Sequence, residues 1–121
     1  MKVMLVDDSK TMRNIQKQVL AQLQITDIVE AVNGQDALSR VGAENPDLIL
    51  LDWNMPTMDG MTFLKAFRQS DMATPVIMVT TEAERRRVIE AIKAGVNNYV
   101  VKPFTPDELK TRIEETMSKA A

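Results

Sequence analysis

The feature that most constrains the fold of this chain is a fivefold alternation of short apolar runs with amphipathic segments. The apolar runs are Lys2–Val6, Ile28–Val32, Leu48–Leu51, Val76–Val79 and Tyr99–Val101. Continuous apolar runs of this length are typical of parallel strands that are buried on both faces. The alternation therefore predicts an α/β fold, in which helices cover both sides of a five-stranded parallel sheet.

Apolar residues spaced by three and four predict helices between these runs. The residues that carry this pattern are Met12, Ile15, Val19 and Leu23; Phe63, Leu64 and Phe67; Val88, Ile89 and Ile92; and Leu109, Ile113 and Met117. Gly95 is predicted to end the fourth helix. Thr105 to Glu108 is predicted to start the last one, with threonine as N-cap, proline in the first turn and glutamate closing a capping box. A helix over Gln35–Val41 competes with the hairpin that Asn33-Gly34 alone would favour.

Length and composition narrow the class of protein. The 121 residues predict a single domain, residues 1–121, with no room for an output domain, and 45% hydrophobic residues are enough to fill a core. A net charge of −2 argues against nucleic-acid binding. Neither a membrane span of roughly 18 apolar residues nor the apolar region of a signal peptide is present, so we expect a cytoplasmic protein.

Two residue types are missing from the chain, and their absence limits its chemistry. Without cysteine there is no disulfide, thiolate nucleophile or zinc–thiolate site. Without histidine there is no Ser-His-Asp triad and no imidazole metal ligand. Any reaction must therefore use carboxylates, hydroxyls, lysine or a bound hard cation.

Polar residues follow four of the five apolar runs. They are Asp7 and Asp8, Asp52, Thr80 and Thr81, and Lys102 and Pro103. Each has an ordinary explanation as a turn residue, a helix cap or a solvated lysine. Ligands of open parallel sheets, however, bind at the carboxyl ends of the strands, where these residues would meet. Three clustered carboxylates repel one another, which either raises their pKa values or demands a cation. An oxygen-only site suits Mg²⁺, and a lysine beside it favours an anion that carries phosphate oxygens.

These residues, taken together, resemble a known family. Asp7-Asp8, the segment DWNMPTMDG at residues 52–60, Thr80 and Lys102-Pro103-Phe104 occur in the order and spacing of the response-regulator receiver domain. The resemblance covers the whole chain and is greatest to single-domain chemotaxis members. It implies a flavodoxin-like (βα)5 three-layer sandwich with strand order 2-1-3-4-5.

The resemblance also implies a role for each matching residue. Asp52 matches the phosphoacceptor, and Asp7, Asp8, Asp52 and the backbone carbonyl of Asn54 match the ligands of Mg²⁺. Thr80 and Lys102 match the residues that contact the phosphoryl group, and Thr80 and Tyr99 match the switch pair. Asn54 and Glu82 match the positions that tune dephosphorylation, and Lys102–Pro103 matches a cis peptide bond.

The family's partners follow from the same resemblance. A histidine kinase is expected to donate the phosphoryl group, which fits a chain that has no histidine of its own. The expected output target is a flagellar motor switch protein or another chemotaxis component, a phosphatase is possible, and the protein is expected to be a monomer that binds neither nucleic acid nor membrane. It is not expected to be an enzyme beyond its own phosphorylation and autodephosphorylation.

Two other functions compete with the chemotaxis switch. The first is a stand-alone receiver that relays or drains phosphate in another two-component pathway. The second is a Mg²⁺-dependent aspartyl phosphohydrolase, which Asn54 disfavours because such enzymes commonly need a second acid at that position. The basic run Arg85–Arg87 is either a solvated face or a docking patch.

Overall fold

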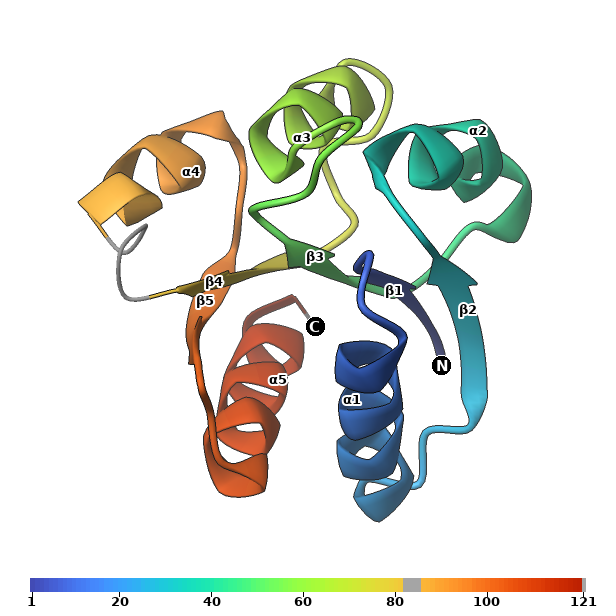
Figure 1. Cartoon of the computed structure of the whole chain (residues 1–121), viewed down its shortest axis with the longest axis vertical. Coiled ribbons are helices and arrows are strands. Elements are labelled where there is room, and N and C mark those ends of the chain that lie inside the picture. The colour runs from blue at the N-terminus through green and yellow to red at the C-terminus, as the bar shows by residue number, and fades with distance from the viewer. Residues whose placement is uncertain (82–85, 121) are drawn as a thin grey trace.

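The computed structural model of the chain describes residues 1–81 and 86–120. In these residues strands and helices alternate along the chain (Figure 1). The strands are β1 (Lys2–Val6), β2 (Asp27–Ala31), β3 (Leu48–Asp52), β4 (Val76–Thr81) and β5 (Asn98–Lys102). The helices are α1 (Lys10–Gln22), α2 (Gly34–Glu44), α3 (Gly60–Arg68), α4 (Val88–Ala94) and α5 (Pro106–Ala120).

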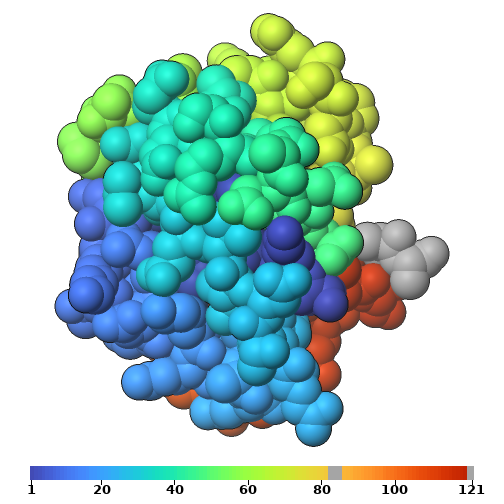
Figure 2. Space-filling model, turned by 90° about the vertical axis from the view of Figure 1, so that its right-hand side faces the viewer, coloured from blue at the N-terminus to red at the C-terminus, as the bar shows by residue number. Residues whose placement is uncertain are grey.

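The strands form one parallel sheet in the order β2-β1-β3-β4-β5, which confirms the predicted topology. Helices α1 and α5 cover one face of this sheet, and α2, α3 and α4 cover the other, so the molecule has three layers (Figure 1). The side seen in Figure 2 is formed mainly by α1, β2 and α2. Within the described parts of the chain, every helix is too short or too polar to cross a membrane.

Burial of the strands follows their place in the sheet. All five residues of β3 are buried, because the strand lies between β1 and β4 and has helices on both faces. Successive side chains of a strand point to opposite faces, so the sheet separates two hydrophobic cores. Met4 and Val6 belong to the core under α2, α3 and α4, and Val3 and Leu5 to the core under α1 and α5.

Side-chain caps fix where several helices begin. Asn33 accepts a hydrogen bond from the Asp36 amide at 2.7 Å, so the Asn33-Gly34 pair starts α2 and does not form a hairpin turn. At α5, the Glu108 amide donates to the Thr105 hydroxyl at 3.1 Å, and the Thr105 amide donates to the Glu108 carboxylate at 3.4 Å. The predicted capping box is confirmed. Gly95 ends α4 with a φ of 116°, as predicted.

The predicted apolar faces of α1 and α4 are partly wrong. Ile15 is 39% exposed, Ile89 68% and Ile92 54%. On α4 the small residue Ala91 is fully buried, because alanine lets the helix approach the sheet closely. The buried face of α1 includes two polar residues among its four members, which are Arg13, Gln16, Val19 and Leu20. A search for apolar spacing cannot find such a face.

Candidate functional site

The carboxylates predicted to converge do meet at the carboxyl ends of β1 and β3. Asp7 directly follows β1 and is fully buried, Asp52 is the last residue of β3 and 4% exposed, and Asp8 is exposed. One carboxylate oxygen from each lies within 4.8 Å of the others. At an effective dielectric constant of 20, such a distance corresponds to a repulsion of about 3 kcal/mol for each pair of charges.

Lys102, the last residue of β5, brings a positive charge into this group. Its Nζ lies 3.3 Å from Asp52 Oδ1 and 3.5 Å from Asp7 Oδ2. Its side chain is 21% exposed, so solvent screens these ion pairs only in part. One lysine against three carboxylates leaves a formal charge of −2 on the cluster.

Two backbone amides donate hydrogen bonds to the buried carboxylates of Asp7 and Asp52. The Ser9 amide donates to Asp7 Oδ1 at 2.8 Å, and the Asn54 amide donates to Asp52 Oδ1 at 3.3 Å. Asp7 Oδ2 is buried and receives no hydrogen bond from any described residue. The Lys102 ammonium lies 3.5 Å from this oxygen, so it supplies charge but not a hydrogen bond, and a bound cation could satisfy the oxygen directly.

Burial and, to a smaller extent, the neighbouring charge of Asp7 raise the pKa of Asp52 to about 6. Lys102 and the Asn54 amide act in the opposite direction but do not offset the other two causes. A group with this pKa is mostly ionised at pH 7 and above, which leaves the carboxylate available as a nucleophile.

The donor set fits a hard divalent cation. Three carboxylates offer oxygen ligands only, and Mg²⁺ takes oxygen ligands from one or two carboxylates while it keeps several waters. The formal charge of −2 that remains beside Lys102 matches one such ion. Thus Asp7, Asp8 and Asp52 could hold a metal ion, and the unsatisfied Oδ2 of Asp7 is the atom that would gain most from it.

The other predicted site residues lie around this cluster. Thr80 is buried on β4, one residue beyond the partner of Asp52 in the sheet, and its hydroxyl donates to the Thr81 carbonyl at 3.4 Å. Asn54 is exposed, and the Lys102–Pro103 peptide bond is cis. Glu82, which was matched to a position that tunes dephosphorylation, lies outside the described residues. Arg85 of the basic run also lies outside them.

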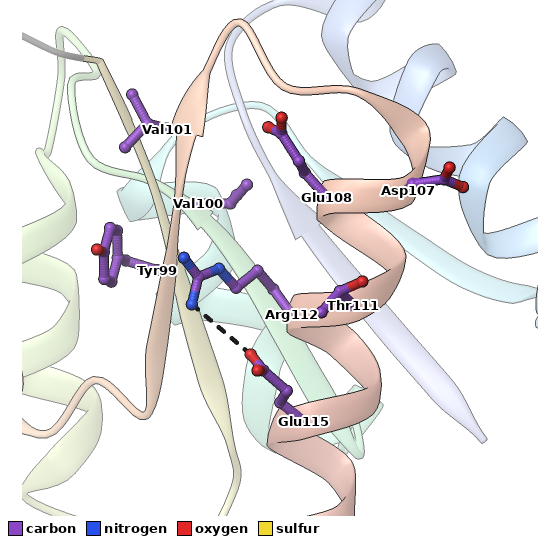
Figure 3. A pocket seen from close by; sticks show the side chains of 8 residues that line it. All are labelled: Tyr99, Val100, Val101, Asp107, Glu108, Thr111, Arg112 and Glu115. Carbon is purple, nitrogen blue, oxygen red and sulfur yellow. Dashed lines mark ion pairs between the residues drawn. The ribbon is translucent and has the colours of Figure 1, made fainter.

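A hollow of about 550 Å³ lies beside β5, between that strand and α5 (Figure 3). Tyr99, the predicted switch residue, lines it and is half-buried. The guanidinium carbon of Arg112 lies 4.9 Å from the centre of the Tyr99 ring, and Arg112 pairs with Glu115 at 3.6 Å. Asp107 and Glu108 add negative charge to the rim, so acids outnumber the single arginine there.

Sequence reasoning missed one residue next to the cluster. Arg13 of α1 is 8% exposed, and its Nη1 donates to the backbone carbonyl of Asp7 at 2.6 Å. The sequence gives no positive signal for this contact. Arg13 follows Met12 in a helix whose apolar residues were predicted to be the buried ones, so a charged residue there is expected to be exposed. Its contact depends on how a long side chain folds back over the helix start, which spacing alone does not reveal.

Comparison with known proteins places the chain among its relatives. The family model described as "Response regulator receiver domain" matches residues 3–114. Chemotaxis protein CheY of Pseudomonas aeruginosa is 46% identical in an alignment of 121 positions that covers 98% of each chain. Chemotaxis protein CheY1 of Helicobacter pylori is 46% identical in an alignment of 117 positions that covers 94% of each chain.

Solved structures give the same result. The chemotaxis protein CheY4 of Vibrio cholerae matches with a TM-score of 0.86 at 33% identity, covering 95% of this chain and 97% of that one. The receiver domain of the Francisella response regulator 1452 matches with a TM-score of 0.87 at 33% identity, covering 99% and 98%. Both similarities extend over nearly the full length of each chain.

Proposed function

The chain belongs to the response regulator receiver domain family, and on this basis we propose that it is a phosphorylation-controlled switch whose phosphate acceptor is Asp52. The observation that carries the proposal is the convergence of Asp7, Asp8 and Asp52 with Lys102 at one edge of the sheet. Family membership supports the reaction class, and the convergence of the cluster supports the choice of residues.

The reaction begins with the Asp52 carboxylate. One of its oxygens attacks the phosphorus of a phosphohistidine on a sensor kinase; the new P–O bond forms as the P–N bond breaks, and the electron pair returns to the imidazole. Water later attacks the same phosphorus, which releases inorganic phosphate and restores the carboxylate. The chemistry is thus confined to the protein's own phosphorylation and dephosphorylation.

Mg²⁺ would be held by Asp7, Asp8 and Asp52 together with the backbone carbonyl of Asn54. Bound there, the ion supplies positive charge that offsets the carboxylates and the transferred oxygens. Lys102 already lies close to Asp52 and is placed to contact the phosphoryl group. These residues act by position and charge, which is what phosphoryl transfer requires of a protein.

The output is a change of surface. A phosphoryl group on Asp52 adds about −1.5 to −2 charge and three acceptor oxygens. Thr80 turns its hydroxyl toward this group, and its present hydrogen bond to Thr81 is long enough, at 3.4 Å, to be given up easily. The space that Thr80 leaves lets Tyr99 turn inward, which reshapes the hollow between β5 and α5.

Chemotaxis is the pathway that the relatives favour. Two relatives at 46% identity are named chemotaxis proteins. We therefore place this chain between a histidine kinase and a flagellar motor switch protein.

Phosphorylation with acetyl phosphate and Mg²⁺ tests the acceptor. Mass spectrometry of the intact protein should show one added phosphoryl group in the wild type and none in Asp52→Asn. Asp27→Asn is the matched control, because Asp27 is an exposed acid on β2 outside the cluster, and it should be labelled normally. Full labelling of Asp52→Asn would refute the assignment, and sustained turnover of added phosphoesters would contradict the limited chemistry.

A further inference from the structure

Arg13 carries a positive charge into a nearly closed environment. It is 8% exposed, and burying a guanidinium is unfavourable unless its donors are satisfied. Its Nη1 donates to the Asp7 carbonyl at 2.6 Å, and its Nε donates to Glu30 Oε1 at 2.9 Å. One side chain of α1 therefore joins the loop after β1 to the edge strand β2.

The Asp7 carbonyl is a sensitive point in that loop. The Asp7 amide still continues the sheet by donating to the Ala31 carbonyl at 3.1 Å, but β1 itself ends at Val6. The carbonyl belongs to the peptide group that links Asp7 to Asp8. Fixing the orientation of that planar group restricts ψ of Asp7 and φ of Asp8, and with them the directions in which the two side chains leave the backbone.

Glu30 is a firm anchor for the arginine. Lys17 Nζ donates to its second carboxylate oxygen at 3.1 Å, and Arg40 Nη1 donates to its backbone carbonyl at 2.7 Å. The hydrogen bond from Arg13 is the main cause that lowers the pKa of Glu30. Glu30 is therefore charged at neutral pH and held from several directions.

We propose that Arg13 is a positioning residue for the metal site: braced on Glu30, its guanidinium holds the Asp7–Asp8 peptide so that both carboxylates face the ion. The proposal rests on the proposed function, since it concerns the same metal site. Outer residues that orient ligands typically change metal affinity by about 10- to 100-fold when they are mutated.

Charge alone predicts the opposite result. A cation near the site repels Mg²⁺, so removing the charge of Arg13 would tighten metal binding if the side chain acted only through its field. Positioning predicts that the loss of Arg13 weakens binding. The sign of the change therefore separates the two effects.

The test measures Mg²⁺ affinity from the fluorescence of Trp53, which adjoins Asp52 and is the only tryptophan. Arg13→Met should bind Mg²⁺ at least about tenfold more weakly than the wild type. Arg13→Lys keeps the charge but cannot fork to two acceptors, so its affinity should fall between the two. Circular dichroism melts identify a temperature at which every variant is folded.

Two variants serve as controls. Lys17→Met removes the other side chain on the Glu30 carboxylate without touching Asp7, and it should lose less affinity than Arg13→Met, because Arg13 still contacts both Glu30 and Asp7. Val19→Ala weakens the packing of α1 from a buried position outside the site, and it should lose stability while keeping its affinity.

Two results would overturn the proposal. One is that Arg13→Met binds Mg²⁺ with an affinity within about twofold of the wild type, or more tightly. A positioning role predicts a loss of affinity of about tenfold or more. The other is an equal loss in Val19→Ala, which would mean that general loosening of α1 explains the effect. If the wild type itself bound no Mg²⁺, the proposed function would fail as well, so the two failures are distinguishable.

Discussion

Asp52 carries its charge at the end of the most buried strand, and the protein is destabilised by that arrangement. The pKa is raised to about 6 by burial and by Asp7, against an ordinary value of 3.8. A raised carboxyl pKa means that folding favours the protonated form. The contribution to stability is therefore full below about pH 4 and is lost as the pH rises through about 6.

This linkage predicts how the metal-free stability of Asp52→Asn compares with that of the wild type. Below about pH 4 the two should differ little, because both side chains are neutral. Above about pH 6 the variant should be more stable, by up to about 3 kcal/mol from the pKa shift. Urea unfolding with a chelator present, at a series of pH values, measures the gap. A gap that is constant with pH would show that Asp52 is not the titrating group.

The ammonium group of Lys102 forms ion pairs with Asp7 and Asp52 and so supplies positive charge next to the candidate metal site. Its removal in Lys102→Met leaves the three carboxylates without an ion pair to a lysine. Mg²⁺ should then bind about fivefold more tightly, which corresponds to about 1 kcal/mol of lost repulsion. Labelling by acetyl phosphate should nevertheless be slower by more than about tenfold, because a charge-assisted contact to the phosphoryl group is lost.

The two effects of Lys102→Met can be measured on the same sample by Trp53 fluorescence and mass spectrometry. Lys93→Met is the matched control, since Lys93 is exposed on α4 outside the cluster, and neither quantity should change. Weaker Mg²⁺ binding in Lys102→Met would mean that the lysine orders the carboxylates more than it competes with the ion.

At the scale of the elements, strands were easier to predict than helix faces. The predicted strand Lys2–Val6 is found with the same limits, because both neighbours in the sheet and both helical layers demand apolar side chains there. Helix α1 instead buries Arg13 and Gln16 while Ile15 remains 39% exposed. Its orientation is set partly by hydrogen bonds of a long polar side chain, and such contacts leave no periodic apolar signal.

In the candidate site too, some features were predictable from the sequence and others were not. Asp7, Asp8, Asp52 and Lys102 were predicted to meet because each follows a parallel strand, and the topology alone brings strand ends together. That rule places strand ends, but it does not predict which distant residues a long side chain will contact. The stacking of Arg112 on Tyr99 and the contact of Arg13 with the Asp7 carbonyl became visible only in three dimensions.

Helix α3 begins against the carboxyl end of β3, and Gly60 permits that close approach. A Cβ at Gly60 would lie 2.6 Å from Cε3 of Trp53, 2.9 Å from its Cα and 3.0 Å from the Asp52 carbonyl oxygen. Because backbone atoms are involved, the strain cannot be relieved by rotating one side chain. The start of α3 and the position of Asp52 are thus mechanically linked.

Gly60→Ala should therefore lower the free energy of unfolding by about 1 to 3 kcal/mol, the usual effect of overpacking, and should slow labelling of Asp52. Gly42→Ala is the matched control in a helix interior. Its Cβ would meet nothing within 4 Å, so it should stabilise the protein by about 0.5 to 1 kcal/mol and leave labelling unchanged. Denaturant unfolding and labelling rates measure both. A Gly60→Ala variant with normal stability would contradict the tight contact.

At the scale of the whole molecule, the proposed acceptor and the proposed output surface lie on different strands. Asp52 ends β3, Thr80 lies near the end of the neighbouring strand β4, and Tyr99 lies on the edge strand β5. A signal from the phosphate must cross the sheet through these neighbours. The hollow lined by Tyr99 and α5 is where a change on β5 would reach the surface (Figure 3).

The contacts that phosphorylation adds set an upper limit on how far it can shift the equilibrium between the inactive and active conformations. Each charge-assisted hydrogen bond contributes about 1.5 to 3 kcal/mol, and Thr80 and Lys102 are the two expected donors. Their sum approaches the ~5.5 kcal/mol needed to move a two-state equilibrium from 1:99 to 99:1. Lys102 already contacts Asp52 at 3.3 Å before phosphorylation, so its part of the gain is smaller.

Partner affinity should therefore rise on phosphorylation by at least about tenfold, which needs only about 1.4 kcal/mol of that gain. A peptide from a flagellar motor switch protein, titrated with and without acetyl phosphate, provides the measurement. Thr80→Ala should still be labelled on Asp52 but should lose most of the increase, because the hydroxyl that links the phosphate to Tyr99 is gone. Unchanged affinity in the labelled wild type would contradict the switch, and would leave a receiver that relays or drains phosphate as the better account.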